Sequence, residues 1–355
     1  MAEHAAAPSQ QLYTFTRSRQ EFDELFLTLS GPDCTDIGEL VDKAEGARIV
    51  RADVFGPPTP DWEEPDFPVT WVCNEHPEGA DLSGVYLHAV QGVETRPLLV
   101  DGRVVGTVVE TPHATECTLA GIRSVHTHRP RPEQARETFE NIEKALAQVD
   151  MDFSNVVRTW LFLDQILDWY KEFNGVRTQF FNERDVFSRL VPASTGIGGA
   201  NPAGSAMVAS AFAMKPKSDQ VCVQAVPSPL QCPALAYGSS FSRVVEVSTP
   251  GCRRLLVSGT ASIDPDGNTV FVGDVDGQVA KTFEVVQAIL ESRGMDWSHV
   301  TRATAYVRLT SDVGAYHRFV ASRPDLATLP AIVANNMICR DDLLFELEVD
   351  AARCD

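Results

Sequence analysis

Basic residues are scarce in this sequence. Its 355 residues include 30 Lys and Arg against 49 Asp and Glu, which gives a formal net charge of −19. Nucleic acids and anionic membrane surfaces are bound through clusters of positive charge. The balance therefore argues against both as partners, and an anionic small molecule would need positive charge concentrated in one pocket.

Long apolar runs are also missing, since no stretch approaches the roughly 20 residues of a membrane helix. The first residues, MAEHAAAPSQQ, show no basic region followed by an apolar one, so we expect no secretory signal. Eight cysteines are scattered without CxxC or CxxH spacing, and we expect reduced thiols in a cytoplasmic protein that holds no metal. The glycine-rich GIGGAN segment lacks the third glycine of a dinucleotide fingerprint, so no cofactor is implied.

The chain contains an internal repeat. Residues 138–158 (TFENIEKALAQVDMDFSNVVR) and 282–302 (TFEVVQAILESRGMDWSHVTR) align without a gap at an offset of 144 and share nine of 21 positions. Each copy has an apolar stripe at helical spacing, which is Ala135, Phe139, Ile142 and Leu146 in the first. A match that holds through a helix, a turn and a strand indicates duplication.

Each copy is predicted to be a ββαβαβ module. After the first helix come an apolar strand (156–163 and 300–307), a second helix (166–182 and 312–322) and a final strand (206–214 and 343–349). Two strands precede each first helix, near 85–90 and 104–110 in one copy and at 242–247 and 254–259 in the other. The expected fold class is α+β, with mixed sheets covered by helices on one side.

The predicted boundaries follow from this pattern. Residues 1–65 are expected to be an N-terminal extension, 66–215 the first module, 216–241 a linker and 242–355 the second module. Pro227, Pro229 and Pro233 discourage regular structure in the linker.

The second copy, with SGTASIDPDGNTVFVGDVDGQVAKTFEVVQAIL and a closing Glu-x-Glu strand, resembles the RidA (YjgF/UK114) family. Two fused copies with PASTGIGG (192–199), YGSSFSR (237–243) and CRDDLLFELE (339–348) look more like the chorismatases. That resemblance implies an enzyme that converts chorismate to pyruvate and either 3-hydroxybenzoate or a dihydroxycyclohexadiene carboxylate.

The closing strand carries the candidate catalytic acid. Alternation places Glu346 and Glu348 on the face opposite Phe345, Leu347 and Val349. A carboxyl buried there would have a raised pKa and could act as a general acid, whereas a solvent-facing carboxylate is the alternative. The resemblance makes Glu346 the acid that protonates the enolpyruvyl methylene. In the first copy, Ser210 or Ala211 is expected at the matching position, so that module has lost the acid.

The resemblance also implies that Cys339 favours the 3-hydroxybenzoate-forming, intramolecular route, although buried packing is its ordinary role. Arginines should hold the two carboxylates of the substrate, because the guanidinium fork fits a carboxylate at two points. The candidate substrate-binding residues are Arg243, Arg340, Tyr237, Thr195, Gly196, Gly259, Thr260 and Ala261. Arg158 and Arg302 are repeat-equivalent candidates that could instead simply flank a strand and pair with Asp.

Other functions stay open at this point. Ile332 stands where RidA proteins carry a substrate-gripping arginine, and Leu230 where chorismatases tend to have a linker arginine. A chorismate hydrolase, a RidA-like imine hydrolase and a non-catalytic accessory protein are therefore alternatives to the 3-hydroxybenzoate-forming enzyme. The expected assembly is a monomer or a small homo-oligomer, with a site between modules of one chain.

Overall fold

The structure, a computed structural model, describes residues 10–57, 65–74 and 82–354. In these residues the strands form three sheets, in the orders β1-β2-β5-β3-β4, β6-β7-β8-β11-β9-β10 and β12-β13-β14-β17-β15-β16. Each sheet combines antiparallel pairs with one parallel edge pair, which confirms the mixed α+β fold class. We call the three sheets with their helices the N-terminal, first and second modules.

Successive segments of the chain supply the three modules. The N-terminal module contains β1 (Gln11–Ser18), β2 (Asp23–Gly31), α1 (Ile37–Lys43), β3 (Arg48–Phe55), β4 (Val69–Val72) and β5 (Ser83–Gln91). The first module contains β6 (Thr95–Val100), β7 (Arg103–Glu110), β8 (Ala114–Arg123), α2 (Arg131–Ala147), β9 (Val156–Leu163), α3 (Ile166–Glu183), β10 (Ala193–Gly198) and β11 (Met207–Pro216). The second module contains β12 (Cys222–Val226), β13 (Val244–Thr249), β14 (Cys252–Ala261), α4 (Val275–Ser292), β15 (Val300–Val307), α5 (Val313–Ala321), β16 (Ala331–Asn335) and β17 (Phe345–Cys354).

The duplicated segments occupy the same place in their sheets. Strands β9 and β15 have the predicted bounds, and in each the third residue is an arginine beside a β-bulge, Arg158 or Arg302. The turn before each strand is capped by an aspartate, Asp152 or Asp296, whose side chain accepts from the backbone two residues on. The repeat therefore preserves the local hydrogen bonds that set where each strand begins.

The N-terminal segment is more than an extension. Its five strands have the order of five of the six strands of each module, with β5 in the place of β11 and β17, and in the described part of the chain a counterpart of the outermost strand β6 or β12 is missing. Among the residues that the structure describes, this sheet has one α-helix, α1, where each module has two. The prediction that 85–90 opens the first module is therefore wrong, because these residues form β5, the central strand of the N-terminal sheet. That sheet runs on both sides of the predicted boundary at residue 65. Pairing with β2 and β3, which sequence periodicity does not reveal, decides where β5 belongs.

The linker also contains regular structure. Residues 222–226 form β12, an antiparallel edge strand on β13, and a short 3-10 helix follows at Ala234–Tyr237. The three prolines all lie after β12, so they do not interfere with its backbone hydrogen bonds.

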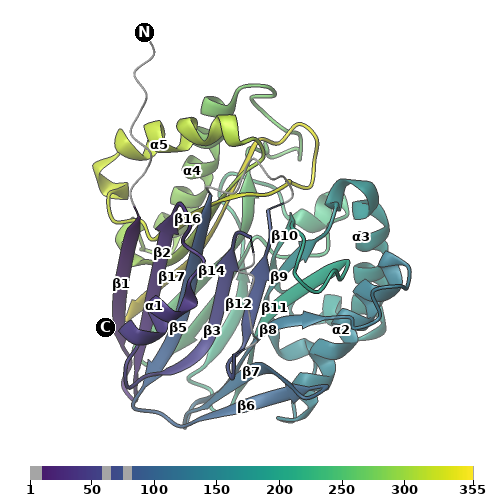
Figure 1. Cartoon of the computed structure of the whole chain (residues 1–355), viewed down its shortest axis with the longest axis vertical. Helices are drawn as coiled ribbons and strands as arrows, with labels where there is room; N and C mark the ends of the chain where they lie inside the picture. Colours follow the sequence, from purple (N-terminus) through teal and green to yellow (C-terminus); the bar gives the residue numbers. More distant parts are fainter. Residues whose placement is uncertain (1–9, 58–64, 75–81, 355) are drawn as a thin grey trace.

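The helices lie outside and the sheets face one another inside. Figure 1 shows α2 and α3 on one side of the molecule and α4 and α5 at its top. Each module has its own core between sheet and helices, and a further core contains residues from all three sheets, among them Phe55, Trp160 and Tyr306. The parallel edge strands β4, β10 and β16 pack on the next module, against β8, β14 and β2 with β5 respectively. The modules therefore close into a ring. In the described part of the chain no helix is long and apolar enough to span a membrane.

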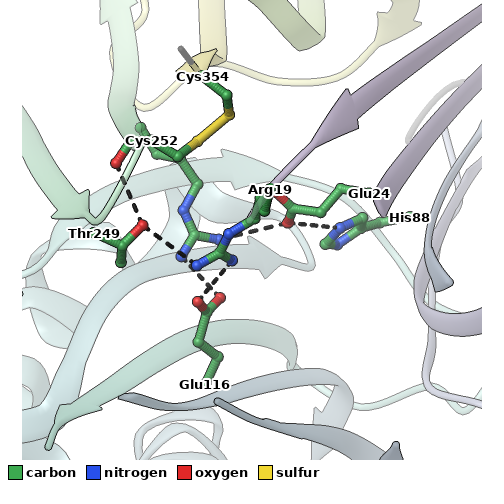
Figure 2. Close-up of a disulfide and its surroundings, with 8 residues drawn as sticks. Arg19, Glu24, His88, Glu116, Thr249, Cys252 and Cys354 are labelled. Atoms are coloured by element: carbon green, nitrogen blue, oxygen red, sulfur yellow. Dashed lines mark hydrogen bonds and ion pairs between the residues drawn. A yellow bond between two sulfur atoms is a disulfide. The ribbon is translucent and has the colours of Figure 1, made fainter. Parts of the chain in front are cut away.

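Two cysteines correct the expectation of reduced thiols throughout. Cys252, the first residue of β14, and Cys354, at the end of β17, face each other across the sheet and form a disulfide (Figure 2). Beside it, Arg19 pairs with Glu116 at 2.8 Å, and His88 lies 3.2 Å from Glu24. The other cysteines are free thiols. The spacing of 102 residues gave no sign of the pairing, because only the sheet register brings the two strands together.

Candidate active site

A cleft lies between the first and second modules. Strand β10 and helix α3 of the first module form one wall, and β14, β17 and the loop after β16 form the other. Its lining residues are Tyr170, Arg177, Ser194, Gly196, Ser239, Phe241, Arg243, Gly259, Ala261, Ile263, Cys339, Arg340, Leu343 and Glu346. We call this the acid cleft, after Glu346.

The acid cleft brings together residues that sequence analysis selected from distant segments. Glu346, Cys339, Arg243, Arg340, Gly196, Gly259 and Ala261 all line it. Thr195 and Thr260 do not, since both are fully buried beside the wall. Tyr237 ends the short 3-10 helix of the linker, but its side chain is outside the part of the structure that is described.

Backbone contacts between the modules fix the two walls. An isolated β-bridge joins Ala193 to Ser242, and the Ser194 amide donates to Ser258 Oγ at 2.8 Å. Ser258 Oγ in turn donates to the Ser242 carbonyl at 2.6 Å. The YGSSFSR segment is therefore held against β10, which places Arg243 at the cleft.

Glu346 is buried at the wall of the cleft. Phe345, Leu347 and Val349 point into the core under the helices, so alternation turns Glu346 to the opposite face. Burial, with Glu348 nearby, raises the pKa of Glu346 to about 8, although Arg243 and Arg158 act in the other direction. At neutral pH this carboxyl therefore keeps its proton, which a general acid requires. The solvent-facing alternative is wrong, as the residue is 5% exposed.

Gly259 makes room for this acid. It lies in a β-bulge between Val257 and Thr260, where β14 and β17 slip by a residue. A Cβ at this position would overlap Glu346 Oε1. The Gly259 amide donates to Thr195 Oγ1 at 3.0 Å, which fixes the bulge to β10 across the module boundary. Thr195 is therefore a support beneath the acid.

Glu348, two residues further along β17, is the charged partner in this pair of carboxyl groups. It accepts from Tyr306 at 3.0 Å and from Thr195 at 2.5 Å, and it forms ion pairs with Arg302 at 2.7 Å and Arg158 at 3.1 Å. Although burial opposes ionisation, these arginines lower the pKa of Glu348 to about 2. The alternative role, pairing with Asp, holds for Arg302, which also contacts Asp53 at 3.3 Å and Asp350 at 3.8 Å, whereas the carboxylate partner of Arg158 is Glu348.

Three arginines surround the open part of the cleft. Arg243 donates to the Cys232 carbonyl at 3.1 Å, and Arg340 donates to the Gly267 carbonyl at 2.9 Å, so both guanidinium groups are anchored at the wall. The third, Arg177, is buried and donates to Asn174 at 2.7 Å. In a pocket of an otherwise acidic protein they supply the local positive charge that an anionic ligand needs.

Sequence analysis missed Arg177 and Tyr170. They lie on α3 together with Asn174, at a spacing of four and three residues, on one side of the helix. This polar stripe could have indicated that one side of the helix lines a site. An arginine on an amphipathic helix is ordinarily solvated, however, so the stripe alone did not single out Arg177. The Asn174 contact and the approach of β10 turn the stripe inward instead.

Tyr170 and Cys339 form the neutral part of the lining. Burial, with Glu346 nearby, raises the pKa of the Cys339 thiol to about 12, and burial raises the pKa of Tyr170 well above its usual range. Both groups thus keep their protons across the neutral range and can donate hydrogen bonds. Cys339 is therefore not a thiolate nucleophile.

No group of three or more His, Cys, Asp or Glu side chains in the described residues is arranged to hold a metal ion.

The sequence profile of a family described as Endoribonuclease L-PSP matches residues 125–207 and 234–352, more than half of the chain. The chain belongs to this family. This chain is 28% identical over 221 residues to a chorismatase of Streptomyces rapamycinicus. The alignment covers 56% of this chain and 64% of that protein. A chorismatase of Streptomyces hygroscopicus is 27% identical, with 54% and 60% covered. The aligned region thus spans less than two thirds of either relative's length.

The fold extends further than the sequence match. A crystal structure of a chorismatase superimposes on this family member with a TM-score of 0.71 at 20% identity, covering 97% of this chain and 100% of that one. The two proteins share their fold throughout, including the N-terminal module.

Val208 of the first module occupies the position that Glu346 has in the second module. Glu346 pairs with Tyr306, and the repeat-equivalent Phe162 pairs with Val208. The expectation of Ser210 or Ala211 is wrong, because Ser210 pairs with Trp160, the repeat counterpart of Thr304, which pairs with Glu348; Ser210 therefore matches Glu348. The first module thus carries an aliphatic side chain where the second carries its acid.

Neither of the two departures from the related families, Ile332 and Leu230, lines the acid cleft. Ile332 packs against Gly84 of the N-terminal module, and Leu230 packs on the core of the second module. Next to Leu230, Gln231 donates to the carbonyls of Ala261 and Ile263, which holds the linker along the rim of the acid cleft. The positive charge of this cleft therefore comes from α3 and from segments 239–243 and 339–343.

Proposed function

We propose that this protein is a chorismatase, in which Glu346 donates a proton to the terminal methylene of the enolpyruvyl ether. The support is the combination of a buried, protonated carboxyl with three arginines in one cleft, in a chain with the chorismatase fold. Chorismate carries two carboxylates, and we expect Arg177, Arg243 and Arg340, which line the cleft, to bind them.

The reaction begins with proton transfer. The C=C electron pair of the enolpyruvyl group takes the proton from Glu346, a C–H bond forms, and the ether oxygen stabilises the resulting cation. Nearby Glu348 stays ionised with Arg158 and Arg302, so it raises the pKa of Glu346 without competing for its proton. The carboxylate formed on Glu346 is stabilised by Arg243 and Arg158.

The ring product depends on whether the nucleophile is a hydroxyl oxygen of the ring or the oxygen of a water molecule. In the route we propose, the ring hydroxyl next to the ether attacks the ring carbon that carries the ether oxygen, that C–O bond breaks to release pyruvate, and the hydroxyl proton passes to the Glu346 carboxylate. The resulting epoxide opens with loss of the ring proton at that carbon and protonation of its oxygen, so chorismate yields pyruvate and 3-hydroxybenzoate with no water consumed. Cys339 stays a neutral thiol beside the ring and restricts the space for water at this point. In the alternative, chorismate hydrolase, one water is consumed and a dihydroxycyclohexadiene carboxylate is released.

RidA-like imine hydrolysis has less support. The position of the RidA arginine is Ile332, buried against the N-terminal module, and its counterpart in the acid cleft is Ser194. Ammonia release from a 2-aminoacrylate-generating assay should accordingly stay at the uncatalysed rate.

The deciding experiment is incubation of the purified chain with chorismate. Pyruvate is followed by coupling to lactate dehydrogenase, and the ring product is compared with authentic 3-hydroxybenzoate by liquid chromatography. We expect equal amounts of pyruvate and 3-hydroxybenzoate. A diene product would assign the hydrolase route, and pyruvate at the uncatalysed rate would rule out a chorismatase. Because one chain completes the cleft, we expect activity in the monomer.

A further inference from the structure

A second cleft repeats the construction of the acid cleft. It lies between the N-terminal and first modules, and its lining includes Phe67, Val69, Trp71, Arg103, Gly121, Arg123, Asn201 and Val208. We call it the Val208 cleft. Edge strand β4 packs on β8 here as β10 packs on β14 in the acid cleft.

The hydrogen bonds beneath the two clefts correspond. In the acid cleft, Thr195 accepts from the Gly259 amide at 3.0 Å and lies 2.5 Å from Glu348. In the Val208 cleft, Thr70 accepts from the Gly121 amide at 2.9 Å and lies 2.5 Å from Ser210. Gly121 and Gly259 lie at corresponding β-bulges, in β8 and β14. The same hydrogen-bonded arrangement of a threonine and a bulge glycine therefore occurs at both module boundaries.

The lining of the Val208 cleft differs from that of the acid cleft mainly in the loss of the acid. Val208 replaces the acid Glu346, while Arg123 stands two residues after the bulge glycine, where the acid cleft has Ala261. Arg103 adds a second guanidinium, and Trp71 and Phe67 add aromatic surface. The cleft thus keeps two guanidinium groups and two aromatic side chains, but it has no group at the Glu346 position that could protonate a ligand.

We propose that the Val208 cleft binds a monocyclic carboxylate of the benzoate class, which it holds without converting. Two guanidinium groups suit a carboxylate, and a flat ring can pack against tryptophan and phenylalanine. Both arginines also make other contacts within the chain, so the ligand's carboxylate joins or exchanges with existing partners. The proposal rests on the cleft's own geometry and stands whether or not the protein acts on chorismate.

Binding of benzoate itself tests the proposal, measured by titration calorimetry on the full chain. Arg103→Gln with Arg123→Gln should weaken binding to the Val208 cleft by about tenfold or more, since each removes a charged hydrogen-bond donor. Arg243→Gln, in the acid cleft, is the matched control and should leave this binding in place. A double variant that binds benzoate as wild type does overturns the proposal.

A crystal soaked with 4-bromobenzoate keeps the test decisive if the double variant fails to fold. The bromine gives an anomalous signal that locates the ring without reference to any variant. A peak between Trp71 and Arg123 supports the proposal, whereas peaks only in the acid cleft, or only at surface positions, contradict it.

Discussion

Glu346 and Glu348 lie two residues apart on one face of β17, yet their environments set their protonation in opposite directions. Glu348 is paired with two buried arginines and has a pKa of about 2, and its charge helps to raise the pKa of Glu346 to about 8. One strand thus provides both a fixed negative charge and a proton donor. Pairs of titratable groups whose pKa values are pushed apart are characteristic of acid–base sites.

The pH dependence should follow the acid. Because Glu346 must carry its proton, kcat/KM for chorismate should be level below about pH 7 and fall about tenfold per pH unit well above pH 8. Initial rates of pyruvate release in buffers of constant ionic strength measure this. Activity that instead rises with pH through 4 to 6 would mean that a carboxylate works as a base.

Gly259 should not tolerate a side chain. Gly259→Ala places a methyl group on the Glu346 carboxyl and should lower kcat for pyruvate release by about 10²-fold, the scale of losing a well-placed acid. Gly175→Ala, on α3 with no atom within 4 Å of the added methyl, is the control. It should keep full activity and gain about 0.5–1 kcal/mol of stability. Equal activities for the two variants would show that the acid need not sit at this bulge.

Arg177 should contribute to substrate binding. Arg177→Gln is expected to raise KM for chorismate about tenfold or more, because a charged hydrogen bond to a carboxylate is worth about 1.5–3 kcal/mol. Arg177→Lys should recover only part of this, since lysine lacks the two-point fork. Lys171→Gln, on the exposed face of the same helix, should leave KM unchanged. A wild-type KM in Arg177→Gln would remove this residue from the site.

Glu348 should matter for stability as well as for catalysis. Glu348→Gln leaves Arg158 and Arg302 buried without their shared partner and should cost about 3–5 kcal/mol of unfolding free energy at pH 7. The depressed pKa means that the wild-type carboxylate stabilises the fold above about pH 4.5 and that this is lost toward pH 2, so the difference should shrink in acid. Urea unfolding at pH 7 and pH 4 measures both, with the exposed Glu284→Gln expected to change little.

The duplicated part of the fold was predictable because its signals are local. Helical stripes such as that of Phe139, and the aspartate-capped turn before Val156 and Val300, are written in consecutive residues. The N-terminal module was not predictable, since β5 is defined by its pairing with β2 and β3, which lie far from it along the chain. The same holds for the disulfide between Cys252 and Cys354.

The candidate site was predictable where one strand or turn carried it. Alternation alone pointed Glu346 away from the helix-facing core, and the structure places it in the cleft. Arg177 required knowledge of which side of α3 faces the second module, which depends on how the modules pack. The match of Val208 to Glu346 needed the pairing of β11 with β9, which relates residues more than 40 positions apart.

The central claim is that Glu346 supplies the proton, and Glu346→Gln tests it most directly. The amide keeps the shape of the side chain and removes its acidic proton. At pH 7, the account predicts that pyruvate release from chorismate falls by about 10²–10⁴-fold while the melting temperature does not fall. Pyruvate release within a few-fold of the wild-type rate would contradict it.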